Sequence, residues 1–292
     1  LGDVYKRQSW KWVGALGVLA GALLSSFYSV VAGWVMAYAL KAPLGSRSSL
    51  ASADDSGAYF GALSSSPVQS LLFHGLFMVV TMIIVARGVK GGIERASRIM
   101  MPTLLALLFF LVLRGISLDG ASAGISFMLR PDFSALNPTV VLTAMGHAFF
   151  TLSVGMGTMI TYGSYLSRDN DLPMLSLQVA TMDTLVAIAA GFAIFPALFA
   201  FGMAPSEGPG LIFVTLPVVF SQMPGGLLFA SMFFILFLMA ALTSSISMLE
   251  VVAAYFIDER GWVRSKAVPL SLIHISEPTR PRLISYAVFC LK

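Results

Sequence analysis

The chain has 292 residues, of which 57% are hydrophobic and 11% charged, and its formal net charge is +4. Soluble globular domains carry about 25% charged residues, so a chain this apolar would expose far too much hydrocarbon to water. Lipid covers such side chains. The composition therefore excludes a soluble globular protein and predicts an α-helical, multi-pass membrane protein.

Both ends of the chain match translated sequencing adapters. Residues 1–8 read LGDVYKRQ and residues 270–292 begin LSLIHISEPTR. We predict adapter-derived segments at 1–8 and 270–292 around a membrane segment at 9–269; a genuine polar tail is the alternative. Residues 9–269 hold 13 Lys and Arg against 12 Asp and Glu, so the net charge does not indicate a nucleic-acid partner. The one cysteine, Cys290, lies in the second adapter and predicts no disulfide.

Six apolar segments are candidates for membrane spans. They cover residues 12–40, 69–86, 95–113, 140–165, 172–201 and 226–257. The third reaches membrane length only if its helix begins near Arg95 rather than at Met100. Basic residues gather between the second and third segments and after the sixth. Because basic loops stay cytoplasmic, the first segment is predicted to run from inside to outside.

The first segment carries small residues on one helical face, at Gly14, Gly17, Gly21 and Ser25. This pattern lets another helix approach closely. Tyr28 continues the face one turn later, and a hydroxyl at membrane depth needs a polar partner. An ordinary packing tyrosine is the alternative interpretation.

The fourth segment contains Ser153, Gly155 and Gly157 in the middle of an apolar span. These residues weaken a helix. A break would free backbone groups that must line a cavity or bind a ligand, as in the broken helices of secondary transporters. The alternative is a continuous helix whose glycines serve close packing, and the spacing alone does not choose between them.

The last two segments carry polar groups that lipid does not tolerate. Asp183 should face the bundle and meet a cation or a donor, unless it lies near enough to the cytoplasm to stay hydrated. Ala240, Thr243, Ser244 and Ser247 share one face of the sixth segment. Their hydroxyl and carbonyl oxygens suit an alkali cation, although such hydroxyls often bond to their own helix.

Other polar residues predict little chemistry. His74 and His147 have no Cys, Asp or Glu at ligand spacing, so we expect no transition-metal site. We find no paired nucleophile and base, and therefore do not expect an enzyme. Glu250 and Asp258 are expected near cytoplasmic water.

Four motifs, in order, resemble helices three to eight of the neurotransmitter:sodium symporter family. They are FYSVVAGW at 27–34, RGVKGGIERASRIMMPT at 87–103, FFTLSVGMG at 149–157 and LTSSISM at 242–248. The resemblance covers residues 9–269, and implies a fragment without family helices one, two and nine onward. It implies a leucine-transporter-like, inverted-repeat bundle with a broken helix at mid-membrane. The implied activity is sodium-coupled symport of an amino acid by alternating access.

The resemblance also implies roles for individual residues. Substrate binding falls to Leu24, Tyr28, Phe150, Thr151, Ser153, Met156 and Met248. The first sodium site takes Thr151 and Asp183, and the second takes the Ala240 carbonyl, Thr243 and Ser244. Gating is implied for Gly92, Pro102, Gly155 and Gly157. The expected cofactors are two sodium ions, with no organic cofactor.

Two departures from the leucine transporter refine these expectations. Asp183 replaces an asparagine, so its carboxylate should remove any need for chloride. Met156 replaces a phenylalanine, and a flexible thioether favours a neutral hydrophobic or aromatic substrate. The expected location is the inner (plasma) membrane, with lipid, sodium and the amino acid as partners and no nucleic acid. The rivals are a proton-driven transporter or channel that uses Asp183, and a sensor that binds without transporting.

Overall fold

A computed structural model describes residues 11–41, 52–167, 169–205 and 208–276. Within these ranges all regular structure is helical. Five helical stretches are long and apolar enough to cross a membrane: α2 (Lys11–Lys41), α4 (Pro67–Ala86), η3 (Val89–Glu94) continued by α5 (Arg95–Ile116), α9 (Leu172–Ala200) and α11 (Gly226–Arg260). The fourth predicted span is divided into α7 (Pro138–Thr151) and α8 (Thr158–Ser164). The α-helical fold with a broken helix is therefore confirmed.

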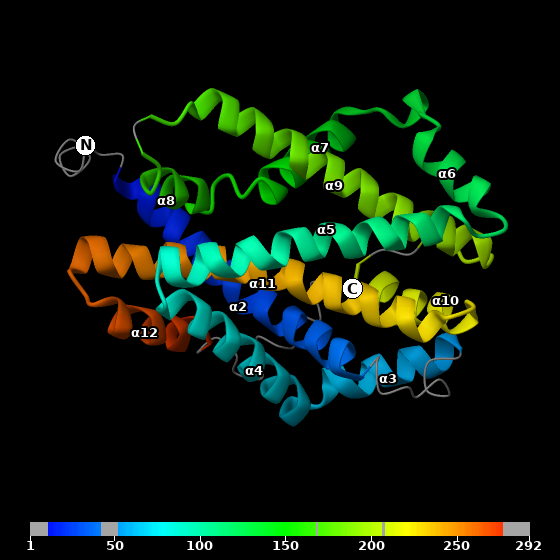
Figure 1. Cartoon of the computed structure of the whole chain (residues 1–292), viewed down its shortest axis with the longest axis horizontal. Helices are drawn as coiled ribbons and strands as arrows, with labels where there is room; N and C mark the ends of the chain where they lie inside the picture. Colours follow the sequence, from blue (N-terminus) through cyan, green and yellow to red (C-terminus); the bar gives the residue numbers. More distant parts are fainter. Residues whose placement is uncertain (1–10, 42–51, 168, 206–207, 277–292) are drawn as a thin grey trace.

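The long helix α11 lies at the centre of the bundle, against α2, α4 and α5 (Figure 1). Outside the face with Thr243, Ser244 and Ser247 its sequence is mostly apolar, which is typical of a helix surrounded by other helices or lipid. The helix α9 packs on α5, and α6 (Ala121–Leu129) packs on α9. The short η4 (Phe133–Ala135) precedes α7.

Polar side chains begin three of these helices. Ser66, Asn137 and Asp171 each accept a hydrogen bond from a backbone N–H three residues later. A proline follows each cap within two residues, where its missing N–H costs nothing. The caps fix where α4, α7 and α9 start, within a few residues of the predicted positions.

A cap of short helices covers one end of α2 and α11. It consists of α3 (Ala53–Ser65), η5 (Leu211–Thr215) and α10 (Leu216–Gln222). The Tyr38 hydroxyl of α2 donates to the Phe213 carbonyl at 2.9 Å, and Phe60 stacks on the Phe213 ring. A buried aromatic cluster therefore joins the cap to the bundle.

The third span begins earlier than either predicted start. It opens with the π-helical turn η3, after Gly88 in a left-handed conformation with φ of 84°, and continues without interruption into α5. Gly92 lies in this turn, and a Cβ there would collide with the Ile84 carbonyl oxygen. Pro102 lies inside α5.

After α11, the chain turns back and α12 (Arg264–Ser276) packs along α11 and α4. The helix includes residues 270–276 of the predicted second adapter. The predicted first adapter and residues 277–292 lie outside the described residues. The assignment of both ends to adapters stays a prediction.

Candidate functional site

The break between α7 and α8 is the main irregularity of the membrane spans. Residues 152–157 form turns and bends instead of helix. Ser153, Gly155 and Gly157 have φ values of 55°, 92° and 76°. Ser153 is the one non-glycine residue with positive φ in the described part of the chain, and such strain persists mainly at functional sites. A continuous helix, the alternative in the sequence analysis, is wrong.

The small-residue face of α2 lies directly against this break. A Cβ on Gly17 would lie 3.2 Å from the backbone nitrogen of Gly157, and a Cβ on Gly21 would lie 3.3 Å from the Met156 carbonyl oxygen. A Cβ on Gly14 would meet nothing within 4 Å. The predicted close approach is therefore present at Gly17 and Gly21, but an unwound backbone occupies it rather than a helix.

Thr151 and Asp183, assigned together to the first sodium site, meet across two helices. The Thr151 hydroxyl donates to the Asp183 carboxylate oxygen Oδ2 at 3.1 Å. This bond joins the end of α7 to the middle of α9, although 32 residues separate the two in sequence. Asp183 is half-buried and has found a donor, as a carboxylate within a span requires.

Tyr28 also finds its partner across the bundle. Its hydroxyl lies close to the Ser244 side chain of α11. One turn away, the Thr243 hydroxyl donates to the Ala240 carbonyl oxygen at 2.8 Å. The structure thus brings Tyr28 beside the residues assigned to the second sodium. A bond from the Thr243 hydroxyl to its own helix is what the alternative interpretation of these hydroxyls predicts. The same bond places the Thr243 hydroxyl oxygen beside the Ala240 carbonyl oxygen, and both are assigned to the second sodium.

The remaining substrate residues differ in how far the described helices cover them. Met248 is 4% exposed, and Leu24, Ser153 and Met156 are half-buried. Phe150, assigned as the aromatic lid, is 50% exposed and is paired with no other aromatic ring in the described part of the chain. The described helices therefore line the break on the α2 and α11 sides and leave the Phe150 side open.

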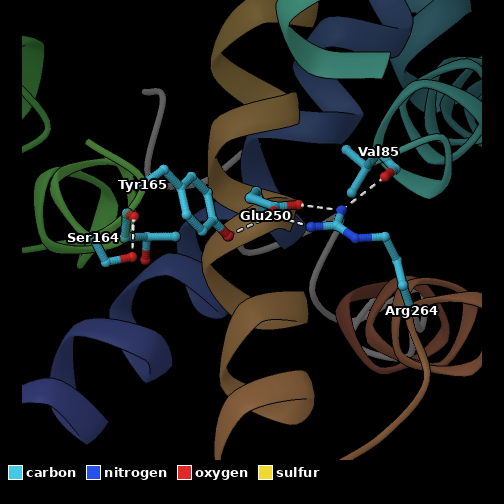
Figure 2. A network of polar contacts seen from close by, with 6 residues as sticks. Val85, Ser164, Tyr165, Glu250 and Arg264 are labelled. Carbon is cyan, nitrogen blue, oxygen red and sulfur yellow. Dashed lines mark hydrogen bonds and ion pairs between the residues drawn. The ribbon is translucent and has the colours of Figure 1, made fainter. Parts of the chain in front are cut away.

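The surroundings of Glu250 were wrongly predicted. Glu250 was expected near water, but it is 0% exposed. Arg264 of α12 donates to both of its carboxylate oxygens, and to the Val85 carbonyl at 2.9 Å (Figure 2). The Tyr165 hydroxyl donates to Glu250 at 2.6 Å. A buried carboxylate needs such partners; α12 supplies Arg264, and the end of α8 supplies Tyr165.

The hydrogen bonds of this network favour the charged form of Arg264. The hydrogen bonds to Glu250 raise the pKa of the Arg264 guanidinium above its ordinary value, so Arg264 stays charged. A second contact lies one turn earlier on α8 and on α11. There the Tyr162 hydroxyl lies 2.9 Å from Ser247 Oγ. Sequence reasoning missed both contacts of α8. The one available signal is that Ser247 and Glu250 lie three residues apart on one face of a helix.

Comparison with known proteins identifies the family. A family model described as the sodium:neurotransmitter symporter family matches residues 67–276. The chain belongs to this family. The predicted resemblance is therefore confirmed, and the family is one of transporters rather than enzymes.

The chain is similar to bacterial relatives. It is 46% identical over 256 residues to the sodium-dependent transporter YhdH of Bacillus subtilis, covering 86% of this chain and 56% of the relative. It is 38% identical over 266 residues to a sodium-dependent transporter of Haemophilus influenzae, covering 90% of this chain and 58% of the relative. It thus spans little more than half the length of these relatives.

A solved structure agrees with the fold. The crystal structure of MhsT in complex with L-phenylalanine superposes with a TM-score of 0.86 at 44% identity, covering 97% of this chain and 63% of MhsT. The leucine-transporter-like fold is therefore confirmed for the part of a symporter that this chain represents.

Proposed function

We propose that the complete protein carries out sodium-coupled symport of a neutral amino acid across the inner (plasma) membrane. The observation that carries this proposal is the break at residues 152–157, seated on the glycines of α2. Unwound backbone at membrane depth is tolerated where its polar atoms line a cavity or bind a ligand. The sodium-dependent relatives support the choice of ion. In this proposal a lipid bilayer surrounds the membrane-spanning helices.

The amino acid occupies the space beside the break in this proposal. Tyr28 exchanges its Ser244 partner for the substrate carboxylate, and Phe150 closes over the side chain. Leu24, Met156 and Met248 form the apolar part of the pocket, and Thr151 and Ser153 supply polar contacts. The apolar residues favour a hydrophobic or aromatic amino acid, and the similarity to MhsT bound to L-phenylalanine supports this class.

Two sodium ions bind on either side of the substrate. The first uses Thr151 and Asp183, whose hydrogen bond already brings their oxygens to 3.1 Å. The second uses the Ala240 carbonyl, Thr243 and Ser244. Hard oxygen donors of this kind suit an alkali cation. Because Asp183 supplies a negative charge near the first ion, transport requires no chloride.

Alternating access follows from the different affinities of the ligands for two conformations. Sodium favours the outward-open form, and the amino acid closes Tyr28 and Phe150 over the site. Gly155 and Gly157 are the flexible points of the break. Gly92 lies in the π-helical turn η3 and Pro102 interrupts the hydrogen bonds of α5. These two residues weaken the helical hydrogen bonding of the η3–α5 span. This supports a role for them in opening the cytoplasmic end of that span.

The test is uptake of labelled L-phenylalanine by the full-length protein in proteoliposomes. We expect uptake when sodium is imposed outside, and none when choline replaces it or when a pH gradient acts alone. Removal of chloride should change nothing. Uptake driven by a pH gradient without sodium would instead support the proton-driven transporter or channel. Sodium-dependent binding without exchange of internal and external substrate would support the sensor.

A further inference from the structure

Two tyrosines attach α8, the second half of the broken helix, to α11. The Tyr162 hydroxyl lies 2.9 Å from Ser247 Oγ, and the Tyr165 hydroxyl donates to Glu250 at 2.6 Å. The partners are three residues apart on both helices, so the two bonds lie about one helical turn apart. The bond to Glu250 joins the charged network. The bond to Ser247 joins the face of α11 that carries the polar residues.

The direction of the bond to Ser247 follows from its protons. Ser247 has one hydroxyl proton and donates it to the Thr243 carbonyl oxygen at 3.1 Å. Tyr162 must therefore be the donor in the contact with Ser247. Thr243 in turn donates its own hydroxyl proton to the Ala240 carbonyl at 2.8 Å. One bond therefore ends on the Thr243 carbonyl and a separate one starts from the Thr243 hydroxyl. Both act on Thr243, which is proposed as a ligand of the second sodium.

We infer that Tyr162 and Ser247 are positioning residues for the second sodium site, and that they link occupation of this site to the position of α8. The inference rests on the proposed function. Tyr162 holds the Ser247 hydroxyl toward the Thr243 carbonyl, across the turn of α11 that runs from Thr243 to Ser247 and begins at a proposed sodium ligand. A cation bound at that turn therefore stabilises the attached position of α8. By thermodynamic reciprocity, the attached position raises the affinity for the cation.

The geometry explains why this bond matters more than an exposed one. Tyr162 and Ser247 are both half-buried, so water competes weakly for their hydroxyls. The contact is also the place where α8, next to the break, reaches the polar face of α11. Its loss leaves α8 attached through Tyr165 and Glu250 alone, at a point one turn farther from Ala240 and Thr243.

The test is a sodium titration of labelled L-phenylalanine binding to the full-length protein, with sodium alone varied. Tyr162→Phe and Ser247→Ala should each raise the sodium concentration for half-maximal binding by roughly three- to tenfold. The double variant should add little beyond either single change, because both remove the same bond. Amino-acid affinity at saturating sodium should stay within about twofold of the unsubstituted protein.

Two matched variants control for a general structural effect. Tyr255→Phe removes a hydroxyl from α11 that makes no hydrogen bond in the described part of the chain, and should titrate like the unsubstituted protein. Ser247→Thr keeps the hydroxyl and should restore the sodium dependence that Ser247→Ala loses. If Tyr162→Phe does not fold, the comparison of Ala and Thr at position 247 decides the question.

Three outcomes would overturn the inference: an unchanged sodium titration in Tyr162→Phe and Ser247→Ala, an equal loss in Ser247→Thr, or an equal weakening of amino-acid binding at saturating sodium. Failure of the proposed function looks different, because the unsubstituted protein would then bind L-phenylalanine equally well without sodium.

Discussion

The two sides of the central helix α11 are held together in different ways. Toward α2 and α4, the contact consists of closely packed apolar side chains such as Phe77 and Leu249, which are 0% and 1% exposed. Toward α8, the contacts include hydrogen bonds from Tyr162 and Tyr165 to Ser247 and Glu250. Single hydrogen bonds hold that side instead. The difference teaches that apolar burial holds α11 to α2 and α4, while polar contacts that can exchange partners hold α8 to α11.

The largest effect should come from the charged network that lies between the two regions. Arg264→Ala leaves the carboxylate of Glu250 buried without its cation, which should cost about 3 kcal/mol of stability. Thermal unfolding in detergent measures the loss. Arg98→Ala is the matched control, because Arg98 pairs with Glu94 on an exposed surface and should change stability by less than about 1 kcal/mol. Equal losses in the two variants would contradict a special role for the buried pair.

Substitution at Gly17, where α2 contacts the unwound backbone, should have nearly as large an effect. In Gly17→Ala the new methyl meets the backbone of Gly157 at 3.2 Å, and overpacking against backbone costs about 1–3 kcal/mol. We expect amino-acid binding at saturating sodium to weaken by about tenfold or more. Gly14→Ala, on the same face but with nothing within 4 Å, should bind normally. If both variants bind normally, α2 does not position the break.

Asp183 tests the polar contact between α7 and α9. Asp183→Asn keeps the shape of the side chain but removes its charge, so sodium should bind about tenfold more weakly or transport should begin to require chloride. Sodium titrations with chloride and with gluconate distinguish these results. Transport unchanged in both respects would remove Asp183 from the proposed site.

The smallest effect concerns the cap of short helices on the packed side. Tyr38→Phe loses the buried hydrogen bond to the Phe213 carbonyl, which should lower stability by about 1 kcal/mol. Tyr59→Phe is a suitable comparison, because its buried hydroxyl has no hydrogen-bond partner within the described ranges. That variant should be neutral or slightly more stable. A greater loss from Tyr59→Phe than from Tyr38→Phe, measured by thermal unfolding, would contradict this account of the cap.

The sequence by itself determined the class of protein, the approximate spans and the family. Apolar segments of membrane length have few other stable structures, and the motifs from Phe27 to Met248 preserve their order. It also located the weak point at Ser153–Gly157, because helix propensity is a local property.

Only the tertiary structure decided whether the helix breaks there and what the break touches. Gly17 and Gly21 predicted a close approach, but their pattern could not say that unwound backbone occupies it. Glu250 was misjudged because its cation, Arg264, arrives on α12 after a turn of the chain. Tyr162 and Ser247 are 85 residues apart. The physical reason is common to all three: such contacts depend on how separate helices pack, and no local pattern of residues records that packing.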